Sequence, residues 1–304
     1  MQTVKPKLSL GSDPEMVVRN KQTGLPVSAV SIFKGRDFDY NKHSPLVKGD
    51  GRQYFHDNVN IEGTMPPASS KEEFILNVKN YVQDAREILG EDFILCNESY
   101  TIFPEKEFDS KEARTFGCSA AYDAFTISSI ERTDAGKIDF RTCGGHIHVG
   151  RSDFKSIEEG ELISFESKIQ SVKLFELILG TALTVIDNDP SSPQRKALYG
   201  KAGEHRPTEY GVEVRSPGNY WLGSPETVGL VWDLSQIVYD IIFDGKADEI
   251  LSKVDENEYV EAINSFNKEK CFEILKNLNV VPDEIIGKIS ELSNIRFFIH
   301  ENWL

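Results

Sequence analysis

The segment Phe140–Gly150, FRTCGGHIHVG, places His146 and His148 two residues apart, directly after a pair of glycines. On a β-strand, side chains two residues apart point to the same face of the sheet. Both imidazoles would then face one site, and imidazole is a common metal ligand. An isolated His-x-His pair is more often a surface or core feature, but the glycines and the apolar Ile147 favour a functional pair here.

Two other segments with strand character repeat this spacing with charged side chains. Asp13 and Glu15 are two apart in SDPEM, and Glu213 and Arg215 are two apart in VEVRSP. Taken singly, such pairs are ordinary solvated charges or a weak surface ion pair. If the three strands are neighbours, one sheet face carries all of these groups, and Glu62 in NVNIEG joins them. Facing carboxylates repel unless cations neutralise them, and oxygen-rich sites suit Mg²⁺ or Mn²⁺.

A basic stretch supplies the opposite charge. Within an acidic chain, residues 195–206 hold five basic side chains: Arg195, Lys196, Lys201, His205 and Arg206. Arginine can grip a phosphate through two parallel hydrogen bonds, and nearby glycines let a backbone approach a ligand. The surrounding segment 186–211 is polar and rich in proline and glycine, so we expect an irregular loop. A carboxylate-rich metal face beside an arginine-rich loop is what a nucleoside triphosphate requires.

Other patterns predict the elements around these residues. Helical periodicity and capping residues predict helices over 70–89, 165–185 and 225–243. We expect a bent strand over 8–20, a strand over 53–64, and two strands joined by the Asp-Ala-Gly-Lys turn before the histidines. Residues 1–243 are predicted to form one catalytic domain, and residues 244–304 a helical C-terminal appendage packed on it.

Composition narrows the class of protein. The chain has 304 residues and a formal net charge of −15, which argues against general nucleic-acid binding through a basic surface. Its four cysteines contain no Cys-x-x-Cys pair, so a structural zinc site of that type is not supported. The longest apolar region is interrupted by Glu176 and should be a buried helix rather than a membrane span. We therefore expect a cytoplasmic protein with no membrane partner.

The order of these motifs resembles the glutamine-synthetase-like carboxylate–amine ligases, and more closely the phage-type carboxylate–amine ligase family, type 2. The resemblance covers residues 8–222 and rests on GSDPEM, DNVNIEGTMPP, FGCSAAYDAF, GGHIHVG, RKALYGKAGEHRP and YGVEVRSPGNYWL. No resemblance is apparent after Phe243. The resemblance over residues 8–222 implies an α+β fold of the glutamine-synthetase type, with a curved, mostly antiparallel sheet backed by helices. It also implies ATP and two or three Mg²⁺ or Mn²⁺ ions as cofactors.

The resemblance also implies roles for individual residues. The implied metal ligands are Asp13, Glu15, Glu62, His146 and Glu213, with an aspartate at position 13 where glutamine synthetases have glutamate. The implied nucleotide contacts are Arg195, Lys201, Arg206 and His148. Arg206 and Arg215 would act on the transferring phosphoryl group. Asp57 is the rival of Glu62, both as a ligand and as the base that accepts the amine proton, and the sequence does not choose between them.

The implied reaction is ATP-dependent formation of an amide or peptide-like bond through an acyl phosphate. Small-molecule or peptide carboxylates and amines would be the substrates, and a phage-encoded enzyme would act in the host cytoplasm. The substrate identities and the oligomeric state stay open. The alternatives are a metal-dependent hydrolase that uses the two histidines, a guanidino-type phosphotransferase on the same fold, and a non-catalytic binding or virion protein.

Overall fold

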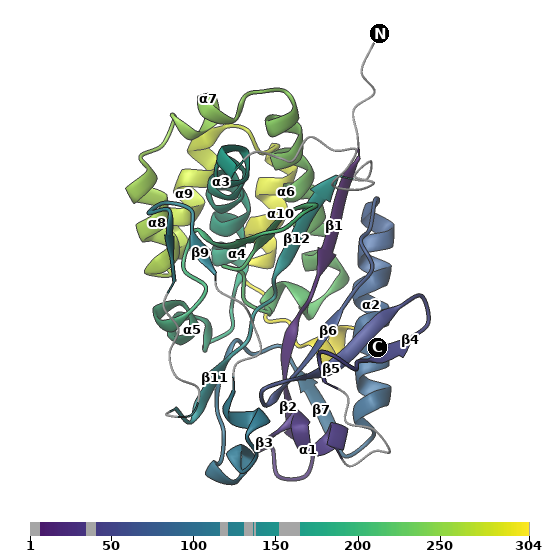
Figure 1. Cartoon of the computed structure of the whole chain (residues 1–304). Coiled ribbons are helices and arrows are strands. Elements are labelled where there is room, and N and C mark those ends of the chain that lie inside the picture. Colours follow the sequence, from purple (N-terminus) through teal and green to yellow (C-terminus); the bar gives the residue numbers. More distant parts are fainter. Residues whose placement is uncertain are drawn as a thin grey trace.

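The computed structural model describes residues 7–34, 41–115, 121–130, 136, 138–151 and 165–303. Two antiparallel sheets of six strands each lie next to each other, and helices back them (Figure 1). A third sheet pairs β8 (Tyr100–Ile102) with β11 (Phe140–Thr142). This architecture confirms the predicted α+β class, with antiparallel sheets backed by helices and a helical C-terminal region.

The first sheet has the strand order β1-β12-β14-β13-β9-β10. Its strands are β1 (Leu8–Ser12), β12 (Ile147–Arg151), β14 (Gly211–Val214), β13 (Glu204–Pro207), β9 (Tyr122–Asp123) and β10 (Ser128–Ser129). The register sets His148 opposite both Gly11 and Glu213, and Glu213 opposite Arg206. The strand of the histidines and the strand of Glu213 are therefore neighbours, as the sequence patterns required.

The second sheet runs β3-β2-β6-β5-β4, with β7 added on β2. Its strands are β3 (Pro26–Val27), β2 (Glu15–Asn20), β6 (Asn60–Thr64), β5 (Arg52–Asp57), β4 (Leu46–Lys48) and β7 (Phe93–Cys96). Here the sequence expectation was wrong in two places. The expected bent strand over 8–20 is two strands in different sheets, because the strand is interrupted at Asp13 and Pro14. The expected single strand over 53–64 is the β5–β6 hairpin, which turns at Asn58 with a positive φ of 59°.

Helices cover the sheets, and the predicted ones are confirmed. They are α1 (Ala29–Lys34), α2 (Lys71–Leu89), α3 (Phe165–Phe175), the π-helix η4 (Glu176–Gly180), α4 (Thr181–Ile186), α5 (Ser192–Leu198) and α6 (Pro225–Phe243). Short 3₁₀ turns are η1 (Glu105–Phe108), η2 (Glu112–Arg114) and η5 (Tyr220–Gly223). Ser70 caps α2 by accepting a hydrogen bond from the Glu73 amide, and Ser224 with Thr227 forms a capping box on α6.

The C-terminal region consists of α7 (Ala247–Leu251), α8 (Glu256–Asn264), α9 (Lys268–Leu278), α10 (Asp283–Leu292) and α11 (Ile299–Asn302). Helices α7 to α10 gather beside α3, α4 and α6 on one side of the first sheet (Figure 1), whereas α11 contacts η5 and strand β7 of the second sheet. Their buried residues belong to the same hydrophobic core as those of α2 and α6. Trp303 donates its indole N–H to the Leu222 carbonyl at 2.6 Å. The division of the chain at residue 243 stays a prediction.

The run Glu166–Ile186 is long and apolar enough to cross a bilayer, but 72% of its apolar 18-residue stretch is buried inside the protein. It is thus a core helix here, as Glu176 had suggested. One other expectation was wrong. β10 and β11, which were expected to pair through a turn, lie in different sheets, and the turn lies mostly outside the described residues. Cys96, Cys143 and Cys271 are free thiols, whereas Cys118 lies outside the described residues.

Candidate functional site

The two histidines converge on one carboxylate. Asp13 Oδ1 lies 3.3 Å from His146 Nδ1 and 2.9 Å from His148 Nε2. Ser12 at the end of β1 donates its hydroxyl to the His146 carbonyl at 2.6 Å, which fixes the two segments against each other. Burial raises the pKa of Asp13, but His148 and His146 outweigh it and hold that pKa well below its usual range. Burial and Arg215 lower the pKa of His146 to about 4.

Glu213 completes this first cluster and carries two arginines. Its Oε1 lies 3.5 Å from His146 Nδ1, and one atom each of Asp13, His148 and Glu213 lie within 4.8 Å of one another. Arg215 donates from Nη1 to Glu213 Oε1, and Arg206 Nε lies 3.1 Å from Glu213 Oε2. Because Glu213 and Arg215 are both 1% exposed, this ion pair is almost fully removed from solvent.

A second cluster consists of carboxylates alone. Glu15 on β2 lies opposite Glu62 on β6, and Asp57 ends the neighbouring strand β5. Their oxygens lie within 4.8 Å of one another, and all three residues are buried. Burial, followed by the charge of Asp57, raises the pKa of Glu15 to about 8 and that of Glu62 well above its usual value. Packing three carboxylates this closely in the interior is unfavourable unless a cation neutralises them.

The residues present fit divalent cations. Asp13 Oδ1, His146 Nδ1 and His148 Nε2 are buried polar atoms that make no hydrogen bond, although they lie close together. Buried polar groups normally have a partner, so three orphan atoms aimed at one point indicate a ligand. Oxygen with a minority of imidazole nitrogen is a donor set that suits Mg²⁺ or Mn²⁺. Asp13 also raises the pKa of Glu15 and of Glu62, which places the two clusters near each other.

The glycines before the histidines have a steric reason. A Cβ on Gly144 would lie 2.0 Å from His146 Nε2, and a Cβ on Gly145 would lie 2.6 Å from the Gly218 carbonyl oxygen. The Gly144 amide donates to Glu15 Oε2 at 3.0 Å, so this backbone reaches a carboxylate of the second cluster. Because Gly144 has no side chain, His146 of the first cluster and Glu15 of the second cluster can both lie against its backbone.

We expect Gly145→Ala to destabilise the protein by about 1–3 kcal/mol, because the new methyl group collides with backbone that cannot move away cheaply. The matched control is Gly287→Ala, on the exposed face of α10, where an added Cβ meets nothing within 4 Å. There alanine should stabilise the helix by about 0.5–1 kcal/mol. Urea unfolding of both variants measures the difference, and equal midpoints would contradict the steric explanation.

The hairpin of the second cluster is held by a buried arginine. Arg141 on β11 donates from Nε to Asn58 Oδ1 at 2.6 Å and from Nη2 to the Ala113 carbonyl at 2.9 Å. Burial and Arg114 lower the pKa of Arg141 to about 10. Asn58 takes a left-handed conformation directly after Asp57, so this bond fixes a turn that is unfavourable for most residues. The sequence offered no signal for the role of Arg141.

The basic segment differs from its prediction. Residues 193–207 are not an irregular loop but belong to α5, a turn and β13. Arg195 is buried and donates to the carbonyls of Cys143, Ser216 and Arg215, so it supports the backbone beside the site. Lys201 is exposed in the turn before β13. Among the described residues, no hydrogen bond or ion pair joins Arg195 or Lys201 to a carboxylate of either cluster, and their phosphate contacts stay predictions.

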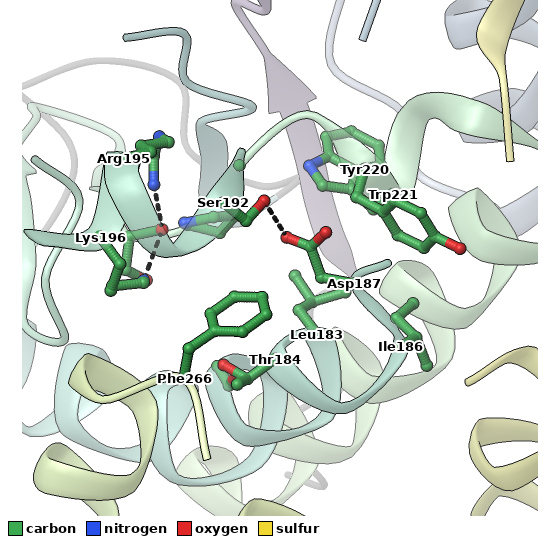
Figure 2. A pocket seen from close by; sticks show the side chains of 14 residues that line it. Leu183, Thr184, Ile186, Asp187, Ser192, Arg195, Lys196, Tyr220, Trp221 and Phe266 are labelled. Atoms are coloured by element: carbon green, nitrogen blue, oxygen red, sulfur yellow. Dashed lines mark hydrogen bonds between the residues drawn. The ribbon is translucent and has the colours of Figure 1, made fainter. Parts of the chain in front are cut away.

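A cavity lies behind Arg195 and Lys196 (Figure 2). Figure 2 shows these two side chains on the side away from Tyr220 and Trp221, with Ser192 donating to Asp187 at 2.7 Å. The volume that the centre of a water molecule can occupy in this cavity is about 30 Å³. That is room for about two water molecules, so the cavity does not hold a nucleotide.

Two tyrosines that the sequence analysis did not single out contact the histidines. The Tyr199 hydroxyl lies 3.2 Å from His146 Nε2 and accepts a hydrogen bond from Arg215 Nη2. The Tyr210 hydroxyl is hydrogen-bonded to His148 Nδ1. Neither tyrosine repeats the two-residue spacing that marked the other groups. Only the fold brings them to the site.

Comparison with known proteins gives a family and a fold. Residues 121–302 match the family described as phage phiEco32-like COOH.NH2 ligase-type 2. The match runs through the helical region after Phe243, where the motifs had shown no resemblance. A crystal structure of a bifunctional glutathione synthetase from Pasteurella multocida is similar in fold, with a TM-score of 0.50 and 12% identity. It aligns with 95% of this chain, which spans 46% of that protein. No curated protein sequence matches the chain.

Proposed function

Because the chain belongs to the phage phiEco32-like carboxylate–amine ligase family, type 2, which matches residues 121–302, we propose that it joins a carboxylate to an amine at the expense of ATP. The convergence of Asp13, His146, His148 and Glu213 on one point carries this proposal within the structure. It sets an acidic, imidazole-containing site beside Arg206 on β13 and Arg215 directly after β14, as nucleotide phosphates and their ions require.

Two groups of residues would hold Mg²⁺ or Mn²⁺. Asp13, His146, His148 and Glu213 form one group, and Glu15, Asp57 and Glu62 form the other. In this assignment His148 is a metal ligand rather than a phosphate contact, because its Nε2 faces Asp13. Bound divalent ions supply the positive charge that draws triphosphate oxygens into a site lined by carboxylates.

The chemical steps follow from the reaction class. A substrate carboxylate attacks the γ-phosphorus of ATP, ADP leaves, and an acyl phosphate forms. Arg206, whose side chain is 23% exposed, can reach a phosphoryl group while it also contacts Glu213. Arg215 is fully buried and holds Glu213 in place. The amine then attacks the acyl carbon, phosphate leaves, and Asp57 or Glu62 accepts the amine proton.

The test is ADP release by the full chain with Mg²⁺ or Mn²⁺, screened over amino acids, small carboxylates and amines. We expect release to require a carboxylate, an amine and the divalent ion together, and to stop when a chelator is added. A carboxylate labelled with ¹⁸O should transfer one labelled oxygen to the released phosphate, because that oxygen bridges carbon and phosphorus in an acyl phosphate. Unlabelled phosphate would exclude the intermediate.

The same assay separates the alternatives. Hydrolysis of an amide without ATP would identify a metal-dependent hydrolase. A stable phosphorylated guanidino product, without amide formation, would identify a phosphotransferase. Failure of every substrate pair to release ADP would count against a ligase.

A further inference from the structure

We propose that Tyr199 and Tyr210 are positioning residues that set the hydrogen-bonding state of the two imidazoles, so that each presents a lone pair to a divalent cation. The inference rests on the proposed function, since it assumes that the cluster around Asp13 binds such a cation. Both tyrosines stand within motifs that carry the family resemblance, RKALYGKAGEHRP and YGVEVRSPGNYWL, but the sequence analysis gave neither of them a role.

The two imidazoles are arranged alike. His146 turns Nδ1 toward Asp13 and Glu213 and Nε2 toward the Tyr199 hydroxyl. His148 turns Nε2 toward Asp13 and Nδ1 toward the Tyr210 hydroxyl. Each ring therefore has one nitrogen at the carboxylates and the other at a phenol. The nitrogens at the carboxylates are the buried atoms that make no hydrogen bond.

A neutral imidazole carries one N–H. The hydrogen bond made by the nitrogen that faces the phenol therefore decides whether the nitrogen that faces the carboxylates keeps a lone pair. If the N–H points at the phenol oxygen, the nitrogen that faces the carboxylates is free to bind a cation. A histidine that binds a metal nearly always donates its other N–H to a fixed acceptor, which orients the ring. In this site the phenol oxygens of Tyr199 and Tyr210 occupy the place of that acceptor.

The hydrogen bond from Arg215 is compatible with this direction at Tyr199. The guanidinium of Arg215 can only donate, so the phenol oxygen accepts from it. A phenol oxygen can accept a second bond, and Nε2 of His146 lies 3.2 Å away, where it supplies that bond in the tautomer that we propose. The cation–π contacts of the Tyr199 ring with Arg195 and Arg215, at 5.1 and 5.7 Å, hold the ring where the oxygen can do so.

The hydroxyls of the two tyrosines should differ in how much they contribute to cation binding. Tyr210 is 37% exposed, so water can take the place of its hydroxyl beside His148. Tyr199 is less exposed and also binds Arg215, so water replaces it less readily. Loss of the Tyr199 hydroxyl should therefore loosen cation binding more than loss of the Tyr210 hydroxyl.

The experiment measures Mn²⁺ binding to the full chain without ATP or other substrate, from the electron paramagnetic resonance signal of the free ion. We expect Tyr199→Phe to weaken Mn²⁺ binding by about 10- to 100-fold, the range usual when a metal ligand loses its outer partner. Tyr210→Phe should weaken it by a smaller factor. Tyr259→Phe is the matched control, because its hydroxyl is buried, makes no hydrogen bond and lies outside both clusters. It should bind Mn²⁺ like the wild type.

The outcomes are distinguishable from failure of the proposed function. If the wild type does not bind Mn²⁺, the metal assignment fails and this inference with it. If the wild type binds and Tyr199→Phe binds equally well, only the inference is overturned. Melting temperatures without Mn²⁺ show that the variants fold. Should Tyr199→Phe not fold, Tyr210→Phe decides alone: weaker Mn²⁺ binding supports the proposal, and unchanged binding overturns it.

Discussion

Replacing Asp13 with asparagine is expected to lower ATP-dependent turnover by about 100- to 1000-fold, equivalent to about 3–4 kcal/mol of lost transition-state stabilisation. Its Oδ1 lies within 3.3 Å of both imidazoles, and its charge reaches both carboxylate clusters. Asparagine keeps the size of the side chain but removes the charge, so a divalent cation would lose its central anionic ligand. Mn²⁺ binding should weaken in parallel with turnover.

The control for this variant is Asp244→Asn, at the C-terminal end of α6, where the side chain is 46% exposed beside Lys246. It removes the same charge from the surface and should leave turnover within about twofold of wild type, since exposed pairs contribute little. Turnover and Mn²⁺ titration of both variants measure the effect. Wild-type turnover in Asp13→Asn would remove this residue from the site.

The second large effect concerns stability. Repulsion among carboxylates alone would predict that Glu213→Ala stabilises the metal-free protein. The geometry predicts the opposite, because Glu213 is the buried counter-ion of Arg215 and also contacts Arg206. Removing one partner of a buried pair leaves an uncompensated charge, and we expect a loss of about 3–5 kcal/mol in the free energy of unfolding.

Glu256→Gln provides the comparison, because Glu256 is 44% exposed and pairs with Lys173 at the surface. Such a pair is worth about 0–1 kcal/mol, so the urea midpoint of that variant should stay near that of wild type. Unfolding of both variants with a chelator present separates this effect from any bound cation. If Glu213→Ala is as stable as wild type, Glu213 is not the essential counter-ion of Arg215.

Alternation at two-residue spacing predicted the histidine site well. His146 and His148 face one carboxylate, and the next strand brings Glu213 opposite His148, because a period of two is intrinsic to a strand. The same rule failed for Asp13 and Glu15. The strand is interrupted at Asp13 and Pro14, so that Asp13 joins the histidines while Glu15 enters the other sheet opposite Glu62. The predicted single sheet face is therefore a junction between two sheets.

The remaining site residues depend on tertiary contacts that a single sequence does not encode in its spacing. Arg195 carries the charge expected of a phosphate ligand. Its side chain is buried, however, so its guanidinium donates to backbone carbonyls instead of water. Tyr199 and Tyr210 come from segments with no periodic pattern. Arg141 acts across the chain on Asn58, more than eighty residues away. Contacts between residues so far apart in the sequence can be predicted only when the pairing of the strands is known.

The pairing of β1 with β12 has a consequence for shortened forms of the chain. A fragment that begins at residue 121 would keep the matched family region and its histidines, but it would lack β1. The amide and carbonyl groups of β12 that now bond to Leu8–Ser12 would then lie unpaired along a sheet border. Borders of this kind recruit strands from other molecules, so such a fragment would tend to aggregate rather than remain a smaller working unit.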